Sequence, residues 1–426
     1  MRILFLNDLS DPRIGSSVRQ MYQEASRLRE LGHETALVTA VQYVAQATPT
    51  QILGLDTWRL FSDYNPRFRS FRSLDNPATR APFARVLAEF RPDVVHSHLI
   101  HTHLSYRALE QARAAGAGVV FTAHDVMTFC YQKLTCFHGG EANGGRLRDY
   151  RADWQKCLPC QRLRYNPWRN ARIRRVLERC VDRFTVVSDE LGLAIRANGI
   201  RVDRTVHNAI QRAPRLSTEE ELQRFRAKHG LVGMQVIAMG GRLHEQKGVA
   251  QLFLVLARLA PRFERLRLLV MGKREVYETE FRSLARRLGI EERIVPTGWL
   301  DGEELAAAYG TTDVFVTPSI CFDTFGLVNL EAMEHGKPVV ATSFGGSREV
   351  VVDGVTGYVA NPFDLDNFSE RVGRLLAEPA LAARLGAAGR ERLSALFSIE
   401  RLTDEFLEEY GAAGAAAAAR RSPRPR

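Results

Sequence analysis

Short apolar runs alternate with amphipathic segments along most of the chain. Residues 2–7, RILFLN, form an apolar run of strand length, and residues 17–31 repeat apolar side chains every three or four positions, which is the period of a helix. The same succession of apolar run, glycine turn and amphipathic segment returns at 235–259. Strands that alternate with helices are typical of parallel sheets covered on both faces. We therefore expect an α/β fold.

The densest pattern surrounds Pro318. The run DVFVTP at 313–318 is apolar, rich in β-branched residues and closed by proline, which predicts a buried parallel strand. The segment LVNLEAMEHG begins at Leu327 with helical spacing and ends at Gly336, so we expect a helix there. Gly326 precedes this helix and lets the backbone come close to a ligand. The unpaired N–H groups of a helix start favour an anion, most naturally a phosphate.

Two acids in this stretch lie eight positions apart. Asp323 comes just before the predicted helix, and Glu331 lies within it. The order acid, seven residues, acid, with FG after the first acid and EAM at the second, resembles the signature of the family 4 retaining glycosyltransferases. In that family the first acid is usually glutamate. For the spacing alone, a βα unit of another doubly wound sheet with incidental acids is the alternative.

A second glycine turn, GGRLHEQKG at 240–248, carries two cations. Arg242 can hold two phosphate oxygens as a fork and Lys247 adds a point charge, so the pair suits a diphosphate. The segment lacks the GxxxxGK[ST] pattern of a Walker motif. As a whole it resembles the phosphate-binding segment of the same family, and two surface cations at a βα corner are the alternative.

The first half of the chain offers a looser version of this pattern. Gly15 and Ser16 lie in the turn between the first strand and the first helix, where α/β sheets bind ligands. His124 lies at the end of the apolar run GVVFTAHD, and the resemblance implies that it lies beside the sugar of the donor. A glycine present for steric reasons and a hydrogen-bonded structural histidine are the alternatives.

The resemblance implies the GT-B architecture, in which two Rossmann-like doubly wound domains face each other across a cleft and a C-terminal helix crosses back to the N-terminal domain. It implies transfer of a sugar from a nucleoside diphosphate sugar to an acceptor hydroxyl with retention. The catalytic set that it implies comprises His124, Arg242, Lys247, Asp323 and Glu331. We expect the two cations to contact the leaving diphosphate, Glu331 the ribose and Asp323 the sugar. The implied donor-binding set is Gly15, Ser16, Gly241, Val295, Phe325, Gly326, Leu327 and Val328.

The length of 426 residues suits two or three domains. We expect an N-terminal, acceptor-side domain at 1–200 with a cysteine-bearing insertion at about 126–170, and a C-terminal nucleotide-sugar donor domain at 201–395. The crossover helix is expected at 396–411, followed by a disordered tail at 412–426. Within the first domain, the prolines and scattered arginines of 42–82 predict an irregular excursion outside the core.

The net charge of +10 is concentrated in the first half. Residues 1–200 hold 28 Lys and Arg against 19 Asp and Glu, and many of these cations flank Tyr165 and Trp168 within 161–179. Basic residues among aromatics can bind nucleic acid, an anionic membrane or a phosphorylated acceptor, and a solvated helix face is the alternative. No nucleic-acid motif is present. We therefore expect a phosphorylated or lipid-linked hydroxyl acceptor, as in cell-envelope glycan assembly, peripheral contact with an anionic membrane, and no nucleic acid.

Four of the six cysteines lie close together in the sequence, at Cys130, Cys136, Cys157 and Cys160. A CxxC pair with two further thiols suits a structural zinc, with His138 as a substitute ligand, and a cluster of reduced thiols is the alternative. Catalysis is expected to need no divalent cation, because Asp364 and Asp366, which have DxD spacing, have the pattern of a helix start.

The sequence also bears on location and on other activities. No run approaches the roughly 18 apolar residues of a membrane span, and Asn7 and Asp8 interrupt the first apolar run before a signal sequence can form. We expect a cytoplasmic protein that contacts the inner face of the membrane. The other candidates are a natural-product or small-molecule glycosyltransferase, a phosphorylase or epimerase of the same architecture, and a non-catalytic nucleotide-sugar binding protein.

Overall fold

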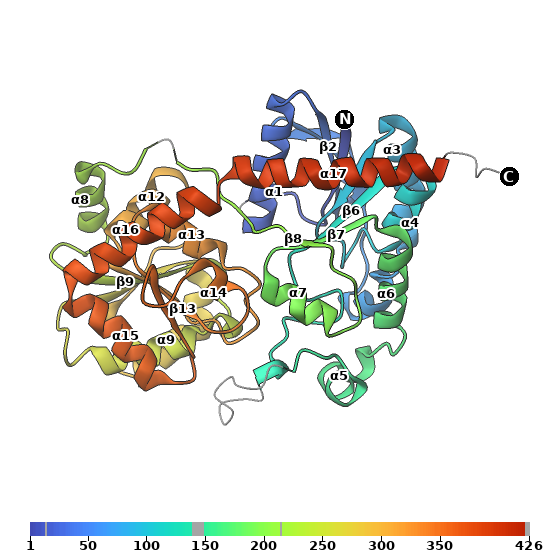
Figure 1. Ribbon diagram of the computed structural model, residues 1–426. Coiled ribbons are helices and arrows are strands. Elements are labelled where there is room, and N and C mark those ends of the chain that lie inside the picture. Colours follow the sequence, from blue (N-terminus) through green and yellow to red (C-terminus); the bar gives the residue numbers. More distant parts are fainter. Residues whose placement is uncertain (13–14, 139–148, 214, 422–426) are drawn as a thin grey trace. The chain divides into compact units, whose positions relative to one another are not determined.

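The computed structural model describes residues 1–12, 15–138, 149–213 and 215–421. Within them the chain forms two compact α/β units (Figure 1). Unit 1 contains Met1–Leu134, Tyr150–Ala209 and Ile399–Arg426, and unit 2 contains Thr135–Asp149 and Ile210–Ser398.

Unit 1 extends past the predicted boundary at residue 200. Strand β8 (Arg204–Thr205) adds a short parallel strand beside β7 (Arg183–Val186). Val206 and Ala209 then enter the apolar core of the unit. A strand of two residues has no periodicity of its own, so the sequence pattern ends earlier than the unit does.

An eight-stranded sheet forms the centre of unit 1, in the order β3-β4-β2-β1-β5-β6-β7-β8. Neighbouring strands are parallel except for the β3–β4 pair at one edge. The central strands are rich in Val, Leu and Phe and are buried, as expected for parallel strands covered by helices. Besides β7 and β8, the strands are β1 (Arg2–Leu6), β2 (Glu34–Val41), β3 (Thr50–Ile52), β4 (Leu55–Phe61), β5 (Val94–Ser97) and β6 (Gly118–Ala123).

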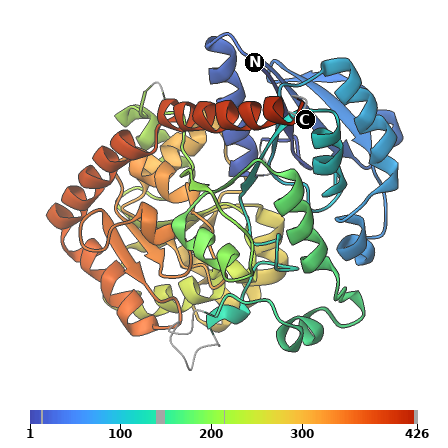
Figure 2. The ribbon, with the colours of Figure 1, turned by 45° about the vertical axis from the view of Figure 1, so that its right-hand side comes forward.

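In unit 1 the last helix of the chain, α17, packs beside the first, α1, and also contacts β6 (Figures 1 and 2). Helices α4 and α6 form a second pair. The helices are α1 (Ser16–Glu30), α2 (Arg69–Arg72), α3 (Pro77–Phe90), α4 (Arg107–Ala114), α5 (Trp154–Gln161), α6 (Arg169–Cys180), α7 (Asp189–Arg196) and α17 (Ile399–Arg421). Short 3-10 turns are η1 (Val44–Gln46), η2 (Pro66–Phe68) and η5 (Arg162–Arg164).

Residues 42–82 contribute to the core, contrary to the prediction of an irregular excursion. Strand β4 pairs with β2, and its side chains Leu55 and Leu60 are buried. Pro66 and Pro77 occupy the first positions of η2 and α3, where a proline removes no helical hydrogen bond. These two prolines therefore start helices in this segment.

Helix α17 runs to Arg421, whereas its alanine-rich end predicts a disordered tail from residue 412. Ala413 and Ala417 are buried in unit 1, and Arg420 pairs with Asp182. Alanine has the highest helix propensity, so these contacts are sufficient to continue the helix. Residues 422–426 of the predicted tail lie outside the described residues.

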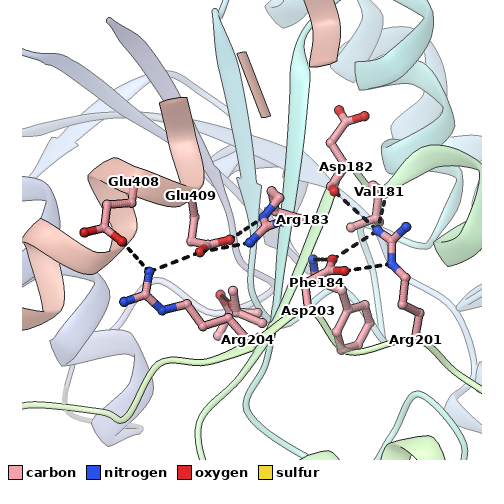
Figure 3. Close-up of polar contacts among 11 residues, drawn as sticks. Val181, Asp182, Arg183, Phe184, Arg201, Asp203, Arg204, Glu408 and Glu409 are labelled. Carbon is pink, nitrogen blue, oxygen red and sulfur yellow. Dashed lines mark hydrogen bonds and ion pairs between the residues drawn. The ribbon is translucent and has the colours of Figure 1, made fainter. Parts of the chain in front are cut away.

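Charged side chains attach α17 to the last strands of unit 1 (Figure 3). Glu409 is only 2% exposed, and its carboxylate accepts hydrogen bonds from Nε of Arg183 at 2.6 Å and from Nη2 at 3.3 Å. Arg204 reaches the carboxylates of both Glu408 and Glu409. A buried carboxylate is stable only with such partners. Charge pairing therefore fixes the position of α17 along β7 and β8, in addition to apolar packing.

A buried polar chain joins α17 to α1 and to the strands. The hydroxyl of Tyr410 donates to the carboxylate of Glu24 and lies 2.7 Å from Nδ1 of His96. A hydroxyl has one proton to donate, so Nδ1 of His96 is the donor in the second bond. Nε2 of His96 lies 2.7 Å from the hydroxyl of Thr122. All four side chains are buried, and they supply the partners that water would otherwise provide.

Two further histidines meet where β5 and β6 end. Nδ1 of His98 lies 2.8 Å from Nε2 of His124, and both rings are buried. Burial, reinforced by the neighbouring His96, lowers the pKa of His98 well below its usual range and lowers the pKa of His124 to about 3. Both rings are therefore neutral near pH 7.

Unit 2 is built on a six-stranded parallel sheet in the order β11-β10-β9-β12-β13-β14. The strand order changes direction between β9 and β12. In open α/β sheets, ligands bind at the carboxyl ends of the strands at such a point. The strands are β9 (Gln235–Gly240), β10 (Leu266–Met271), β11 (Ile294–Pro296), β12 (Val314–Thr317), β13 (Val339–Thr342) and β14 (Gly357–Ala360).

The helices of unit 2 begin at residues suited to caps. Thr218 and Glu221 form a capping box at the start of α8, and Asp364 caps α15 by accepting from the amide of Asn367 at 3.1 Å.

In the described part of the chain, no helix is both long and apolar enough to cross a bilayer. The helices are α8 (Glu219–Lys228), α9 (Val249–Leu259), α10 (Arg274–Val276), α11 (Arg282–Arg287), α12 (Gly302–Thr311), α13 (Leu327–Glu334), α14 (Ser347–Val350), α15 (Leu365–Ala377) and α16 (Pro379–Leu396), with short turns η3 (Cys136–His138), η6 (Glu245–Lys247) and η8 (Glu291–Arg293) and a π-helical turn, η7 (Tyr277–Phe281).

Replacing Tyr410 by phenylalanine should destabilise unit 1. The substitution leaves the buried groups of Glu24 and His96 without their shared partner, so the free energy of unfolding should fall by about 1–3 kcal/mol. Urea denaturation measures this change. Tyr358→Phe is the matched control, because the Tyr358 hydroxyl makes no hydrogen bond to the described residues. Equal stability of the two variants would contradict the role given to Tyr410.

Stability should fall as the pH falls from about 6.5 toward 3. Unfolded His124 takes up a proton near pH 6.5, whereas the folded pKa is about 3. Its contribution is therefore complete above pH 6.5, and about 2 kcal/mol of it is lost by pH 5. Urea denaturation across this range should give a shallower pH dependence for His124→Asn. Parallel profiles for the two proteins would show that His124 does not carry this dependence.

Candidate functional site

The predicted donor residues of unit 2 gather at the carboxyl edge of its sheet, where β9 and β12 are neighbours. The loop after β9 carries Gly241, Arg242 and Lys247, and the loop after β12 leads through Asp323 to α13. The sequence predicts both loops separately. The structure shows that they contact each other.

Asp323 is held by its backbone and by its side chain. Its amide donates to the carbonyl of Phe344 at 3.2 Å, and its own carbonyl accepts from the amide of Gly346 at 2.7 Å. Oδ2 of the carboxylate lies 3.4 Å from Nζ of Lys247 and accepts from the hydroxyl of Ser319 at 3.2 Å. The acid from one loop and the cation from the other therefore form a pair.

Two glycines permit the close contacts of the loop after β12, Gly248 with the loop after β9 and Gly345 with the loop after β13. A Cβ atom on Gly248 would lie 1.8 Å from the carbonyl oxygen of Pro318, and one on Gly345 would lie 2.1 Å from that of Asp323. Both glycines also have positive φ angles, of 73° and 85°. A side chain at Gly248 would therefore push the loop after β12 away from the segment of Lys247, and a side chain at Gly345 would push Asp323 away from the loop after β13.

Lys247 and Arg242 place positive charge at this edge. Burial lowers the pKa of the Lys247 ammonium, but the neighbouring Asp323 and Cys321 raise it by more, so that its pKa lies above the usual value. Lys247 is therefore charged at neutral pH. Arg242 is exposed and close enough to oppose the charge of Lys247. The two predicted cations thus share one region.

Helix α13 begins directly after Gly326, which has a φ of 80°. Two buried polar atoms lie next to this glycine, Nδ2 of Asn329 and Oγ of Ser347, and neither has a hydrogen-bond partner among the described residues. Unsatisfied buried polar groups are uncommon in folded proteins. Together with the first amides of α13, these groups suit the binding of a phosphate.

Glu331 is oriented by a tyrosine from another helix. Its Oε2 accepts a hydrogen bond from the hydroxyl of Tyr309 on α12 at 2.6 Å. Tyr309 is buried and stacked on His335, with 5.5 Å between the ring centroids. Sequence reasoning missed Tyr309, because no local pattern relates it to a residue 22 positions later.

The other predicted donor-binding residues of unit 2 differ in exposure. Phe325 is buried, and its ring lies 5.8 Å from that of Phe397 between centroids. Leu327 is also buried, so only the backbones of these two residues are available to a ligand. Val328 is partly exposed, as is Val295 on the edge strand β11.

In unit 1, Gly15 caps the start of α1 and Ser16 is the first residue of that helix. Gly15 has extended backbone with a φ of −162°, and a Cβ atom would meet no other atom closer than 3.7 Å. Neither the backbone conformation nor the space at this position therefore requires glycine. His124 lies at the end of β6, paired with His98. The signal that could have indicated this pairing is the string HSH at 96–98, directly before the segment that leads to His124.

The four cysteines predicted as zinc ligands do not converge within the part of the chain that the structure describes. They belong to none of the groups of three or more ligating side chains whose ligand atoms lie within 4.8 Å of one another. Cys136 belongs to unit 2, whereas Cys130, Cys157 and Cys160 belong to unit 1. Residues 139–148 of the predicted insertion lie outside the described residues. The structural zinc stays a prediction.

Two family models match the chain, one on each unit. The model described as "Glycosyl transferase 4-like domain" matches residues 15–209, and the model described as "Glycosyl transferases group 1" matches residues 222–392.

Two mannosyltransferases are among the curated relatives. The GDP-mannose-dependent alpha-(1-6)-phosphatidylinositol monomannoside mannosyltransferase of Mycolicibacterium smegmatis is 37% identical over 173 residues, which are 39% of this chain and 45% of that protein. The MMP alpha-(1->4)-mannosyltransferase of Mycolicibacterium hassiacum is 34% identical over 197 residues, which are 46% of this chain and 47% of that protein. The chain thus spans about half the length of the curated relatives it matches.

The fold of the whole chain also has counterparts among solved structures. Anabaena Alr3699/HepE, solved in complex with UDP and glucose, superimposes with a TM-score of 0.72 and 19% sequence identity. The match covers 97% of this chain and 100% of the HepE chain. At 19% identity it shows similarity of fold only. With one family model on each unit and this fold, the chain belongs to the family 4 glycosyltransferases of GT-B architecture.

Proposed function

We propose that the protein is a retaining glycosyltransferase that transfers a sugar from a nucleoside diphosphate sugar to an acceptor hydroxyl. The observation that carries this proposal is the meeting of Lys247, Asp323 and the start of α13 at the carboxyl edge of the unit 2 sheet. GDP-mannose and UDP-glucose are the first donors to test. One relative is named for GDP-mannose, and one structural neighbour was solved with UDP and glucose.

In the proposed mechanism, negative charge grows on the diphosphate as its bond to the sugar breaks. Arg242, Lys247 and the first amides of α13 stabilise that charge. Glu331 accepts from the ribose hydroxyls and Asp323 accepts from the sugar, so they hold the donor at both ends. No divalent cation takes part in this mechanism.

The binding of the sugar also involves unit 1 in this proposal. His124 acts as a neutral hydrogen-bonding group beside the sugar, because its pKa of about 3 keeps the ring uncharged. Gly15 and Ser16 contribute backbone groups to the donor. The side chain of Asp323 is shorter than that of the usual glutamate, and its carboxylate is held by Lys247 and Ser319. The position of this carboxylate therefore determines which sugar hydroxyls it can bind.

The acceptor in this proposal is a hydroxyl of a phosphorylated or lipid-linked molecule in the assembly of cell-envelope glycans or glycoconjugates. The positive charge of the first half of the chain supports an anionic acceptor. A relative named for phosphatidylinositol monomannoside supports a lipid-linked one. Such an acceptor would bring the protein to the cytoplasmic face of an anionic membrane.

Arg242→Ala should lower kcat/KM by about 10²–10³-fold and leave the melting temperature unchanged. Arg242 is exposed, so its loss removes stabilisation of the leaving group without opening the core. Release of nucleoside diphosphate from UDP-, GDP-, ADP- and dTDP-sugars measures turnover.

Arg265→Ala is the matched control for this test, because Arg265 is an exposed arginine at the amino end of β10, away from the carboxyl edge. A near-normal kcat/KM for Arg242→Ala would refute the role of the arginine. Binding of a nucleotide sugar by the wild type without any turnover would identify a binding protein instead.

Tyr309→Phe should weaken binding of the matching nucleoside diphosphate about tenfold, because Glu331 loses the hydrogen bond that orients it. The variant should also discriminate less between that diphosphate and its 2′-deoxy form. Calorimetric titration with both ligands separates this positioning role from a general loss of structure. With Tyr358→Phe as control, unchanged discrimination in Tyr309→Phe would count against ribose binding by Glu331.

A further inference from the structure

Two short segments of unit 1 expose large apolar side chains. In η2 and α2, Phe68 is 58% exposed and Phe71 is 53% exposed. Around η5, Leu163 is fully exposed and Trp168 is 76% exposed. Single exposed apolar residues are ordinary, but a group of large ones indicates an interaction surface.

Hydrogen bonds hold the two segments side by side. The hydroxyl of Ser70 donates to the carbonyl of Arg164 at 3.0 Å, and Nδ2 of Asn166 donates to the carbonyl of Ser70 at 3.1 Å. The hydroxyl of Tyr131 donates to the carbonyl of Asn166 at 2.6 Å. The guanidinium of Arg169, which is buried, lies over the Tyr131 ring at 4.7 Å. A buried polar layer thus fixes the segments that carry the exposed residues.

Positive charge surrounds these apolar side chains. Neither residues 64–72 nor residues 154–177 contain an Asp or Glu. The exposed cations of these segments include Arg67, Arg162, Arg164, Arg172, Arg174 and Arg175. Within these two segments the apolar groups are therefore accompanied by cations and by no acid, which is the composition of segments that bind the surface of anionic membranes.

We propose that this arginine–aromatic surface, made of residues 66–72 and 162–175, docks on a bilayer that contains anionic phospholipid. Phe68, Phe71, Leu163 and Trp168 enter the interface, and the arginines pair with lipid phosphates. Leu163 favours a bilayer over nucleic acid, since its aliphatic side chain stacks poorly on bases and gains from contact with acyl chains. The inference rests on the proposed function only in giving the membrane contact named there a location.

Vesicle sedimentation of the full chain tests the proposal without donor or acceptor, so its result is independent of transferase activity. Vesicles of phosphatidylcholine mixed with phosphatidylglycerol should bind the protein, and vesicles of phosphatidylcholine alone should not. The double variant Arg164→Gln, Arg172→Gln should bind about 30-fold more weakly. Leu163→Ser with Trp168→Ser should weaken binding at least about tenfold.

Matched controls alter the same residue types elsewhere. Arg265→Gln with Arg287→Gln removes two exposed arginines of unit 2, and Leu193→Ser with Val232→Ser removes two exposed apolar side chains. Both control pairs should bind vesicles like the wild type. Failure to bind anionic vesicles, or equal weakening by test and control pairs, would overturn the proposal. Binding of a single-stranded oligonucleotide but no vesicle would overturn it in favour of nucleic acid.

Discussion

The contact between the loops after β9 and β12 is the constraint on which the candidate donor site depends. It requires a close approach at Gly248, where a Cβ atom would collide with the carbonyl oxygen of Pro318. A second close approach, between Gly345 in the loop after β13 and the carbonyl of Asp323, holds the loop after β12 from its other side. Once that approach is made, Asp323 meets Lys247 and α13 starts beside both. The acid, the cations and the helix start are thus consequences of one backbone arrangement, and each would lose its place if the loops separated.

Lys247 has a structural part in this arrangement as well as the proposed catalytic one. It neutralises Asp323, which is nearly buried, and a buried carboxylate without a partner is costly. Arg242 is exposed and does not neutralise a buried carboxylate. Substitution of Lys247 would therefore disturb both the fold of the loop and the charge of the site. Substitution of Arg242 would change the charge alone, so its effect on turnover is easier to assign to catalysis.

Local patterns predicted the alternation of strands and helices, the start of α13 and the two donor loops, because each depends on residues close in sequence. Long-range partners were not predictable in this way. Tyr309 contacts Glu331 from another helix. His96 lies in β5 and His98 directly follows that strand, and the contacts of both histidines with distant residues arise only from packing. The alanine-rich end of α17 is helical because burial adds to propensity, and burial is a property of the folded unit.

Unit 1 draws its last helix from the end of the chain. Ile399, Leu402, Phe406 and Tyr410 all lie in its apolar core, next to residues of the first strand and helix. During synthesis, residues 210–398 emerge before α17 does. Unit 2 therefore has nearly all of its chain available while unit 1 still lacks part of its core. Although domains generally fold in order from the N-terminus, in this protein the unit that begins first is the one that is completed last.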